Sequence, residues 1–175
     1  ATDHVGGSLH VDGEWGMGTG STSTGTASFY RAPFTGFGGG TAYELEARIT
    51  NGSLSTSGEE FQLTVGFGDT FNTSGQPVDG ACFIYRRDAD GDFWVAVTRS
   101  NSTETKTVTA VAPAGYSSMT VFKIEVNSDG TSISYSINGS SVATHTTNIP
   151  TGSSRLLGIG MKLQKQNGTT GRYAY

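Results

Sequence analysis

The chain has 175 residues, a net charge of −4, only 15% charged residues and 26 glycines. This length can enclose one hydrophobic core, and we predict a single domain over residues 1–175, with residues 1–7 as an N-terminal arm. The weakly negative charge excludes the basic footprint of a nucleic-acid-binding protein, and no apolar run approaches the ~20 residues of a membrane helix. The single cysteine, Cys82, cannot form an internal disulfide, and its apolar neighbours predict a buried, unreactive thiol.

In the first half of the chain, apolar and polar residues alternate with the period of two that is typical of half-buried strands. The clearest run is Tyr43 to Ile49, in which Glu44, Glu46 and Arg48 take the polar positions. In the run Phe61 to Phe67, Gln62 and Thr64 are predicted to point outward. The expected strands cover 8–12, 26–31, 43–49, 61–67, 81–86 and 93–99, with loops at 16–25 and 68–79.

The second half contains the strongest signal for antiparallel strands. Residues 121–126 and 133–137 alternate on either side of Asp129-Gly130, and the second run stops at Asn138-Gly139. Both dipeptides suit tight turns with positive φ, so the segment predicts a meander. A polar strand at 103–111 is expected near a sheet edge, and a last pair is expected near 156–163 and 171–175.

No stretch shows a convincing helical period of 3.6. Some ten to twelve short strands at intervals of roughly 8–12 residues predict an all-β protein with two packed antiparallel sheets.

The order of these elements resembles the concanavalin A-like, or laminin-G-like, jelly roll, in a version found in tail, fibre and other structural proteins of bacteriophages. The segments that carry the resemblance extend from about residue 8 to the end of the chain: 9–15, 43–49, 61–69, 94–105, 137–150 and 168–172.

The resemblance implies a fold class, an all-β two-sheet jelly-roll sandwich, and a setting. The setting is a non-enzymatic structural module of a virion, such as a fibre, spike or capsid-decorating domain. It would lie on the particle surface, pack as a homotrimer against other virion proteins, and contact host glycans. The ending at Tyr175 implies a fragment or a chain without its tail. The alternative is a carbohydrate-binding module, alone or attached to a glycan-active enzyme.

Sugar binding requires exposed aromatic faces flanked by hydrogen-bonding side chains. The aromatic candidates for glycan binding are Trp15, Tyr85, Trp94 and Tyr116. Core packing is the favoured interpretation of Trp94, which lies between Phe93 and Val95, whereas Trp15 follows a Gly-Glu pair in a loop-like context.

Asp88, Asp90 and Asp92 form a cluster that resembles part of a calcium loop, because carboxylates spaced by two can converge on one hard cation. The later bidentate glutamate of an EF-hand is missing, and Asp-Gly is also good turn chemistry. A hairpin turn is therefore favoured over a Ca²⁺ site, and no other cofactor is expected.

The sequence shows no convincing arrangement of catalytic residues. Glu44 and Glu46 have the spacing of a glucanase acid and nucleophile, but Arg48 at the next position on the same face favours a solvent-facing stripe. His145 is expected at a surface or edge position. The cluster Lys162, Lys165 and Arg172 is expected on a wet strand face. We therefore predict that the chain is not an enzyme.

Overall fold

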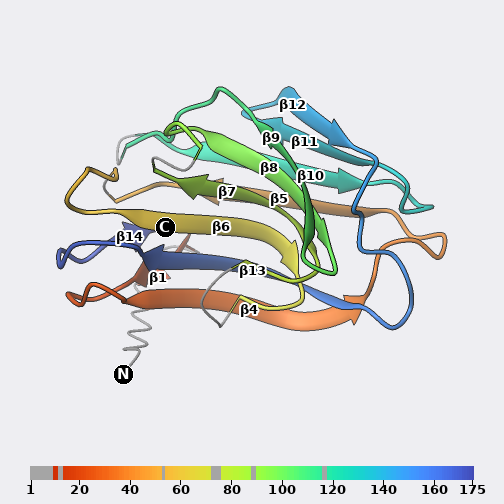
Figure 1. The fold of residues 1–175 in the computed structure, drawn as a ribbon, viewed down its shortest axis with the longest axis horizontal. Coiled ribbons are helices and arrows are strands. Elements are labelled where there is room, and N and C mark those ends of the chain that lie inside the picture. The colour runs from red at the N-terminus through yellow and green to blue at the C-terminus, as the bar shows by residue number, and fades with distance from the viewer. Residues whose placement is uncertain (1–9, 12–13, 53, 72–75, 88–89, 116–117) are drawn as a thin grey trace.

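The computed structural model describes residues 10–11, 14–52, 54–71, 76–87, 90–115 and 118–175. Within these residues the chain forms strands and turns but no helix, and none of it could cross a membrane as a long apolar helix. The strands form two antiparallel sheets packed face to face, as Figure 1 shows. The prediction of an all-β sandwich is confirmed.

The large sheet has six strands in the order β4-β13-β6-β7-β8-β9. Their bounds are Thr26–Thr35 (β4), Leu156–Lys165 (β13), Phe61–Gly68 (β6), Gly80–Arg86 (β7), Trp94–Ser100 (β8) and Thr103–Val108 (β9). The polar strand predicted near a sheet edge is β9, which does lie at the edge of this sheet.

The small sheet has four strands in the order β12-β11-β10-β5. Their bounds are Ser140–His145 (β12), Ile133–Ile137 (β11), Thr120–Val126 (β10) and Tyr43–Ile49 (β5). The meander predicted from Asp129-Gly130 and Asn138-Gly139 is confirmed as β10-β11-β12, with positive φ at Gly130, Asn138 and Gly139.

Two short ribbons close one end of the sandwich. The first pairs β1 (His10–Val11) with β2 (Glu14–Trp15), and the second pairs β3 (Met17–Gly18) with β14 (Tyr173–Ala174). Two expectations were therefore wrong. Residues 16–25 are not all loop, and the C-terminal strand pairs with β3 instead of with β13.

The core lies between the sheets and is rich in aromatic rings. The alternation of β10, in which Phe122, Ile124 and Val126 are buried, places every second residue inward. The Phe122 ring meets Phe83 at 4.9 Å and Trp94 at 4.5 Å between ring centroids, so the two sheets are joined by aromatic contacts. Such aromatic pairs stabilise the fold beyond the effect of the area that they bury.

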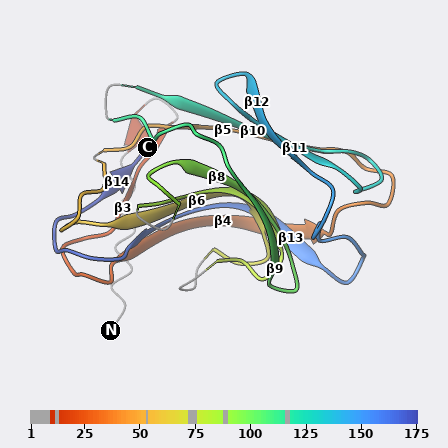
Figure 2. The ribbon, with the colours of Figure 1, turned by 45° about the horizontal axis from the view of Figure 1, so that its top comes forward.

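The large sheet is curved, and its concave side faces away from the small sheet (Figure 2). We call this outer surface the concave face. The inward positions of β6 hold Phe61, Leu63, Val65 and Phe67, so the alternate positions, Gln62 and Thr64, lie on the concave face. Both are nevertheless buried, which corrects the expectation of two solvent-facing side chains.

Candidate functional site

The concave face is divided into two halves by what covers it. Strand register gives its rows: Lys162, Thr64, Ile84, Val95 and Val108 form one row, and Gly158, Gly68, Gly80, Arg99 and Glu104 form another. In the second row, glycines occupy the end over β13 and β6, and charged side chains occupy the end over β8 and β9. This row therefore divides the concave face into a half on which other parts of the chain can pack closely and a half that carries polar side chains.

The first half is closed by residues 69–71 and 76–79 of the chain itself. Phe71 is fully buried, and a Cβ built on Gly160 would overlap its ring. A Cβ on Gly68 would lie 2.8 Å from Pro77, and one on Gly158 would lie 2.6 Å from Tyr30. These glycines, which we call the glycine floor, lack the side chains that would push the aromatic rings away. Tyr30 and Phe71 complete the cover, with ring centroids 6.0 Å apart.

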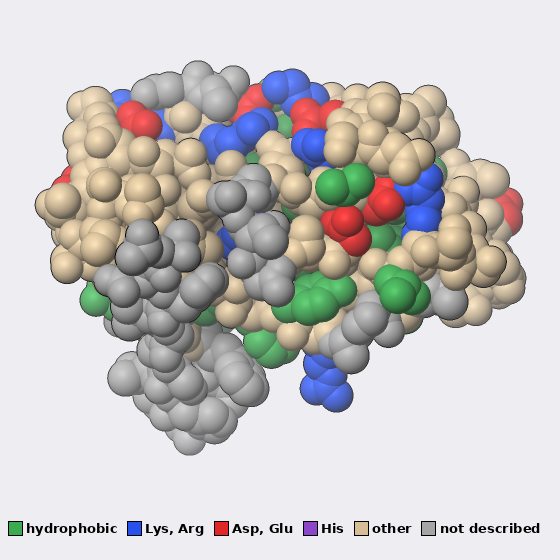
Figure 3. All heavy atoms as spheres, turned by 60° about the horizontal axis from the view of Figure 1, so that its bottom comes forward, with side chains coloured by type: hydrophobic (Ala, Val, Ile, Leu, Met, Phe, Trp, Pro, Cys, Tyr) green, Lys and Arg blue, Asp and Glu red, His purple; other side chains and the backbone are tan. Residues whose placement is uncertain are grey.

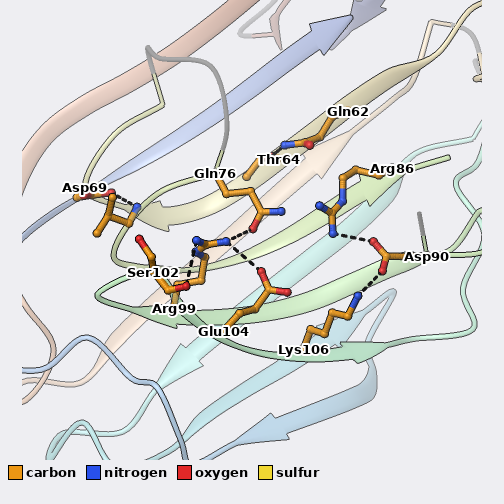
Figure 4. A network of polar contacts seen from close by, with 11 residues as sticks. Gln62, Thr64, Asp69, Gln76, Arg86, Asp90, Arg99, Ser102, Glu104 and Lys106 are labelled. Atoms are coloured by element: carbon orange, nitrogen blue, oxygen red, sulfur yellow. Dashed lines mark hydrogen bonds and ion pairs between the residues drawn. The ribbon is translucent and has the colours of Figure 1, made fainter. Parts of the chain in front are cut away.

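The second half carries a network of charged side chains, shown in Figure 4. The Asp90 carboxylate accepts a hydrogen bond from Arg86 Nη2 at 2.9 Å and another from Lys106 Nζ at 2.7 Å. Beside it, Arg99 Nη1 donates to Gln76 Oε1 at 2.6 Å and to Glu104 Oε2 at 3.1 Å. We call Arg86, Asp90, Arg99, Glu104 and Lys106 the polar strip.

The polar strip is held in place from several elements. Arg86 ends β7, Arg99 lies in β8, and Glu104 and Lys106 lie two residues apart in β9, so their side chains leave the same face. Figure 3, which views the molecule from this side, shows basic and acidic side chains next to one another on the face. The ion pairs fix the direction of these long side chains before any ligand arrives.

Electrostatics keep Asp90 ionised. Burial alone would raise the pKa of the Asp90 carboxyl, but the hydrogen bond from Lys106 and the charge of Arg86 outweigh burial and hold the pKa below its ordinary value. Such a carboxyl accepts hydrogen bonds and does not donate a proton near neutral pH. The strip can therefore bind polar groups, but Asp90 is unsuited to general acid catalysis.

The predicted aromatic candidates do not form a sugar platform. Trp94 is fully buried and Tyr85 is 2% exposed, and the two rings contact each other at 5.7 Å on the inner side of the sheet. The favoured interpretation of Trp94 as a core residue is confirmed, whereas Tyr85 as a glycan-binding candidate was wrong, because its ring has no face open to a ligand. The backbone of Trp15 belongs to β2, but its side chain lies outside the described residues, as does Tyr116.

The described members of the acidic cluster considered as a calcium site form ion pairs with basic side chains. Asp90 faces Arg86 and Lys106, and Asp92 lies 3.6 Å from Arg87, whereas Asp88 is outside the described residues. No group of three or more acidic, histidine or cysteine side chains suited to a metal occurs in the described parts of the chain. The favoured alternative, a turn between β7 and β8, is confirmed by their antiparallel pairing.

Glu44 and Glu46 lie on the opposite side of the molecule from the concave face. Both are exposed on the outer face of β5, and Glu46 accepts a hydrogen bond from Arg48 Nε at 3.1 Å. The interpretation as a solvent-facing stripe is confirmed.

Three cations expected on a wet face are buried instead. Lys162 is 1% exposed, Lys165 is 2% exposed and Arg172 is 6% exposed, so that expectation was wrong. Lys162 lies on the concave face opposite Thr64, and burial lowers the pKa of its ammonium group. The alternation of residues along the chain does not reveal which parts of the chain cover these cations.

Arg172 and Lys165 face an anion-binding arrangement, which the chain fills with its own Glu59. The Glu59 carboxylate accepts hydrogen bonds from the backbone N–H groups of Thr169 and Thr170 at 3.0–3.1 Å and lies 3.7 Å from Arg172. Burial would raise the pKa of Glu59, but the bonds from Thr170 and Thr169 and the charge of Lys165 lower it. This arrangement ties residues 59–60 to the segment before β14.

His145 lies on the edge strand β12, but it is buried and not at the surface. The Thr98 hydroxyl donates to the Thr147 carbonyl at 3.0 Å, so His145 Nδ1, 3.1 Å away, must donate to Thr98. His145 Nε2 then accepts from the Thr107 hydroxyl at 3.0 Å. Burial lowers the pKa of this imidazole, which is neutral and joins β12 to β8 and β9.

Cys82 also lies on the concave face, in a small apolar cluster with Ile84, Val95 and Val97. It is buried, and burial raises the pKa of its thiol to about 12. The prediction of a buried, unreactive thiol is confirmed.

Comparison with known proteins identifies both a family and a fold. A family model described as "SO2946-like, C-terminal domain" matches residues 13–174. A search of curated protein sequences gave no match.

Similar solved structures include the Bacillus licheniformis beta-glucanase, at 17% identity over 93% of this chain and 75% of that chain, with a TM-score of 0.61. The carbohydrate recognition domain of Emp47p has 11% identity over 96% and 83%, with a TM-score of 0.63. The alginate lyase AlyC3, solved in complex with dimannuronate, has 11% identity over 91% and 70%, with a TM-score of 0.62. These likenesses establish a concanavalin A-like jelly roll.

Proposed function

Because the chain belongs to the SO2946-like C-terminal domain family and has a concanavalin A-like fold, we propose that it is a non-enzymatic carbohydrate-binding domain. The ligand would lie on the concave face, over the polar strip. Glycan-binding and glycan-active proteins are among the structures that share the fold, which supports this class of ligand.

The observation that carries the proposal is the ordered state of the polar strip. Arg99 is oriented by Gln76 and Glu104, and Lys106 is oriented by Asp90, so donors and acceptors already point in fixed directions. A sugar that hydrogen-bonds to them loses little affinity to the immobilisation of protein side chains. The exposed Val108 lies two residues from Lys106 on the same face of β9 and offers an apolar contact for a sugar ring.

Binding without catalysis is favoured by the state of the carboxylates. A glycosidase of the usual type needs one protonated carboxyl group and one ionised carboxylate beside the scissile bond. Asp90 has a lowered pKa and bonds to two cations, and Glu104 bonds to Arg99. Neither carboxylate of the strip is placed as a proton donor.

We further propose that this domain is a structural module on the surface of a bacteriophage virion, assembled as a homotrimer and in contact with other virion proteins. This setting rests on the sequence resemblance given above. Electron microscopy of particles that carry the chain, and sedimentation of the isolated chain, would test the location and the trimer respectively.

Glycan-array binding tests the carbohydrate proposal directly. We expect the isolated chain to bind a subset of glycans, and the double variant Arg86→Ala/Lys106→Ala to lose at least roughly tenfold in affinity. Arg48→Ala, which removes an exposed cation from the other sheet, is the matched control and should bind normally. Absence of binding to every glycan, or release of new reducing ends from a polysaccharide, would overturn the proposal.

A further inference from the structure

We infer that the ligand of the polar strip is an acidic polysaccharide, one that carries carboxylate or sulfate groups. This inference rests on the proposed carbohydrate-binding function and names the chemical class of its ligand. It depends on which atoms of the strip a ligand can reach.

The carboxylate at the centre of the strip lies beneath its cations. The Asp90 side chain is 1% exposed, whereas those of its two partners, Arg86 and Lys106, are 25% and 45% exposed. Both Asp90 oxygens already accept hydrogen bonds from these partners. A ligand that approaches this part of the face therefore meets positive charge first.

The ion pairs of Lys123 show the opposite layering. On the small sheet, Lys123 is 34% exposed between Glu44 and Glu125, which are 60% and 46% exposed. There the carboxylates screen the cation from an approaching anion. Around Asp90 the order is reversed, although the chain as a whole carries a net charge of −4. The strip is thus a local cationic site on an acidic protein.

The cations also keep hydrogen-bonding capacity for a ligand. The Lys106 ammonium group has three N–H donors, and one of them is directed to Asp90. The side chain is 45% exposed on the edge strand β9, so the ammonium group can turn its other donors to a ligand. An anionic group on a sugar would accept hydrogen bonds from the other donors of this ammonium group. The buried Asp90 would continue to hold the ammonium group in position.

The neighbouring surface fits a chain of sugar units. Val108 on β9 is 45% exposed, and Val78, whose carbonyl accepts a bond from Ser102 N, is 44% exposed near the turn that ends β8. Along β9, the backbone contact between Val78 and Ser102 lies on one side of Lys106, and Val108 lies on the other. A polysaccharide that follows this strand would place apolar ring faces on the valines and an acidic group at Lys106.

Binding to matched polymers tests the inference. The probes are dextran sulfate and unmodified dextran, which share a backbone, together with polygalacturonate as a carboxylate polymer. We expect either acidic polymer, or both, to bind, and dextran not to bind. Affinity should fall as salt rises, because a solvent-exposed ammonium group is screened. Binding to polygalacturonate alone would identify carboxylate as the recognised group, and binding to dextran sulfate alone would identify sulfate.

Charge variants at one position localise the effect. We expect Lys106→Gln to weaken acidic-polymer binding by roughly five- to tenfold, and Lys106→Glu to abolish it. Arg48→Gln, which removes an exposed cation on the opposite sheet, should leave binding unchanged, and circular dichroism should show all variants folded. Equal loss in Arg48→Gln and Lys106→Gln would overturn the inference.

The failure of the inference can be distinguished from the failure of the proposed function. If neutral glycans bind and Lys106→Gln has no effect on any polymer, the chain binds sugars but not acidic ones through this strip. If no glycan of either kind binds, the carbohydrate-binding function fails as well.

Discussion

The two halves of the concave face use one curved sheet in opposite ways. Over β13 and β6, Gly68, Gly158 and Gly160 make room for aromatic rings of the same chain, and Phe71 becomes part of the interior. Over β8 and β9, charged side chains project from the same face, and Lys106 remains half exposed. The sheet is continuous, so the difference lies in the side chains and not in the backbone.

This contrast shows why a concave sheet is not by itself a binding cleft. Because neighbouring glycines have no side chains, a loop can pack directly on the sheet. This packing buries more apolar area and leaves no space for a ligand. Ion-paired side chains oppose this closure, since a loop packed over them would have to bury charge. Ligand binding is therefore expected only over the polar strip.

The largest expected effect is in the closed half. Phe71→Ala should lower the free energy of unfolding by about 3–5 kcal/mol, because a fully buried ring is lost above glycines that cannot fill the space. Chemical denaturation followed by tryptophan fluorescence would measure the change.

Phe29→Ala is the matched control, since Phe29 is 38% exposed. Its loss should cost much less, about 1 kcal/mol. If the two substitutions cost the same, the loop is not packed on the glycine floor. Glycan binding by folded Phe71→Ala protein should persist if the open half alone holds the ligand.

A smaller effect is expected in the open half. Asp90→Asn should lower the free energy of unfolding by about 1–3 kcal/mol, because a buried acceptor of two charge-assisted hydrogen bonds is replaced by a neutral amide. It should also loosen Lys106 and weaken acidic-polymer binding, even though a negative charge has been removed.

Asp92→Asn provides the comparison for that variant. Asp92 is 52% exposed and pairs with Arg87 at 3.6 Å, so its loss should change stability by less than about 0.5 kcal/mol. Tighter binding of acidic polymers by Asp90→Asn would show that Asp90 repels the ligand and does not position Lys106.

Much of the fold could be predicted from local pattern. The alternation in Tyr43–Ile49 and the Asp-Gly and Asn-Gly turns at 129–130 and 138–139 are local signals, and each predicted an observed element. The same alternation places Tyr85 and Trp94 on the side of Phe83, which is the inner side. Applied strictly, it would have removed both from the glycan candidates.

The rest depends on contacts between distant segments. Alternation assigns Thr64 and Lys162 to one face of the sheet, but it does not tell whether that face is covered, and both are buried. The polar strip joins Arg86, Asp90 and Lys106 through the register of β7, β8 and β9, which sequence spacing leaves open. Arg99 and Glu104, which face each other across one hairpin, and Arg86 and Asp90, which are four residues apart, are the pairs close in sequence.

The inner side of the open half gives a prediction about pH. His145 bonds to Thr98 and Thr107 beneath the strip, packs on Tyr135 at 5.1 Å between ring centroids, and has its pKa lowered by burial. An unfolded histidine takes up a proton near about pH 6.5, whereas folded His145 does so only at lower pH. Between these two pKa values the unfolded state binds more protons, so stability should fall as pH decreases, by at most about 1.4 kcal/mol per pH unit.

Unfolding measured from about pH 8 to about pH 5 in wild-type and His145→Gln protein would isolate this contribution. His4 and His10 are present in both proteins, so their effects cancel in the difference between the two pH profiles. We expect His145→Gln to be less stable by about 1 kcal/mol near pH 8, through loss of one well-placed hydrogen bond. The deficit should shrink as pH falls, because only the wild type then loses stability at this site. A deficit that stays constant with pH would mean that His145 titrates normally and that the edge strand β9, with Lys106 on its outer face, is not held by a buried neutral imidazole.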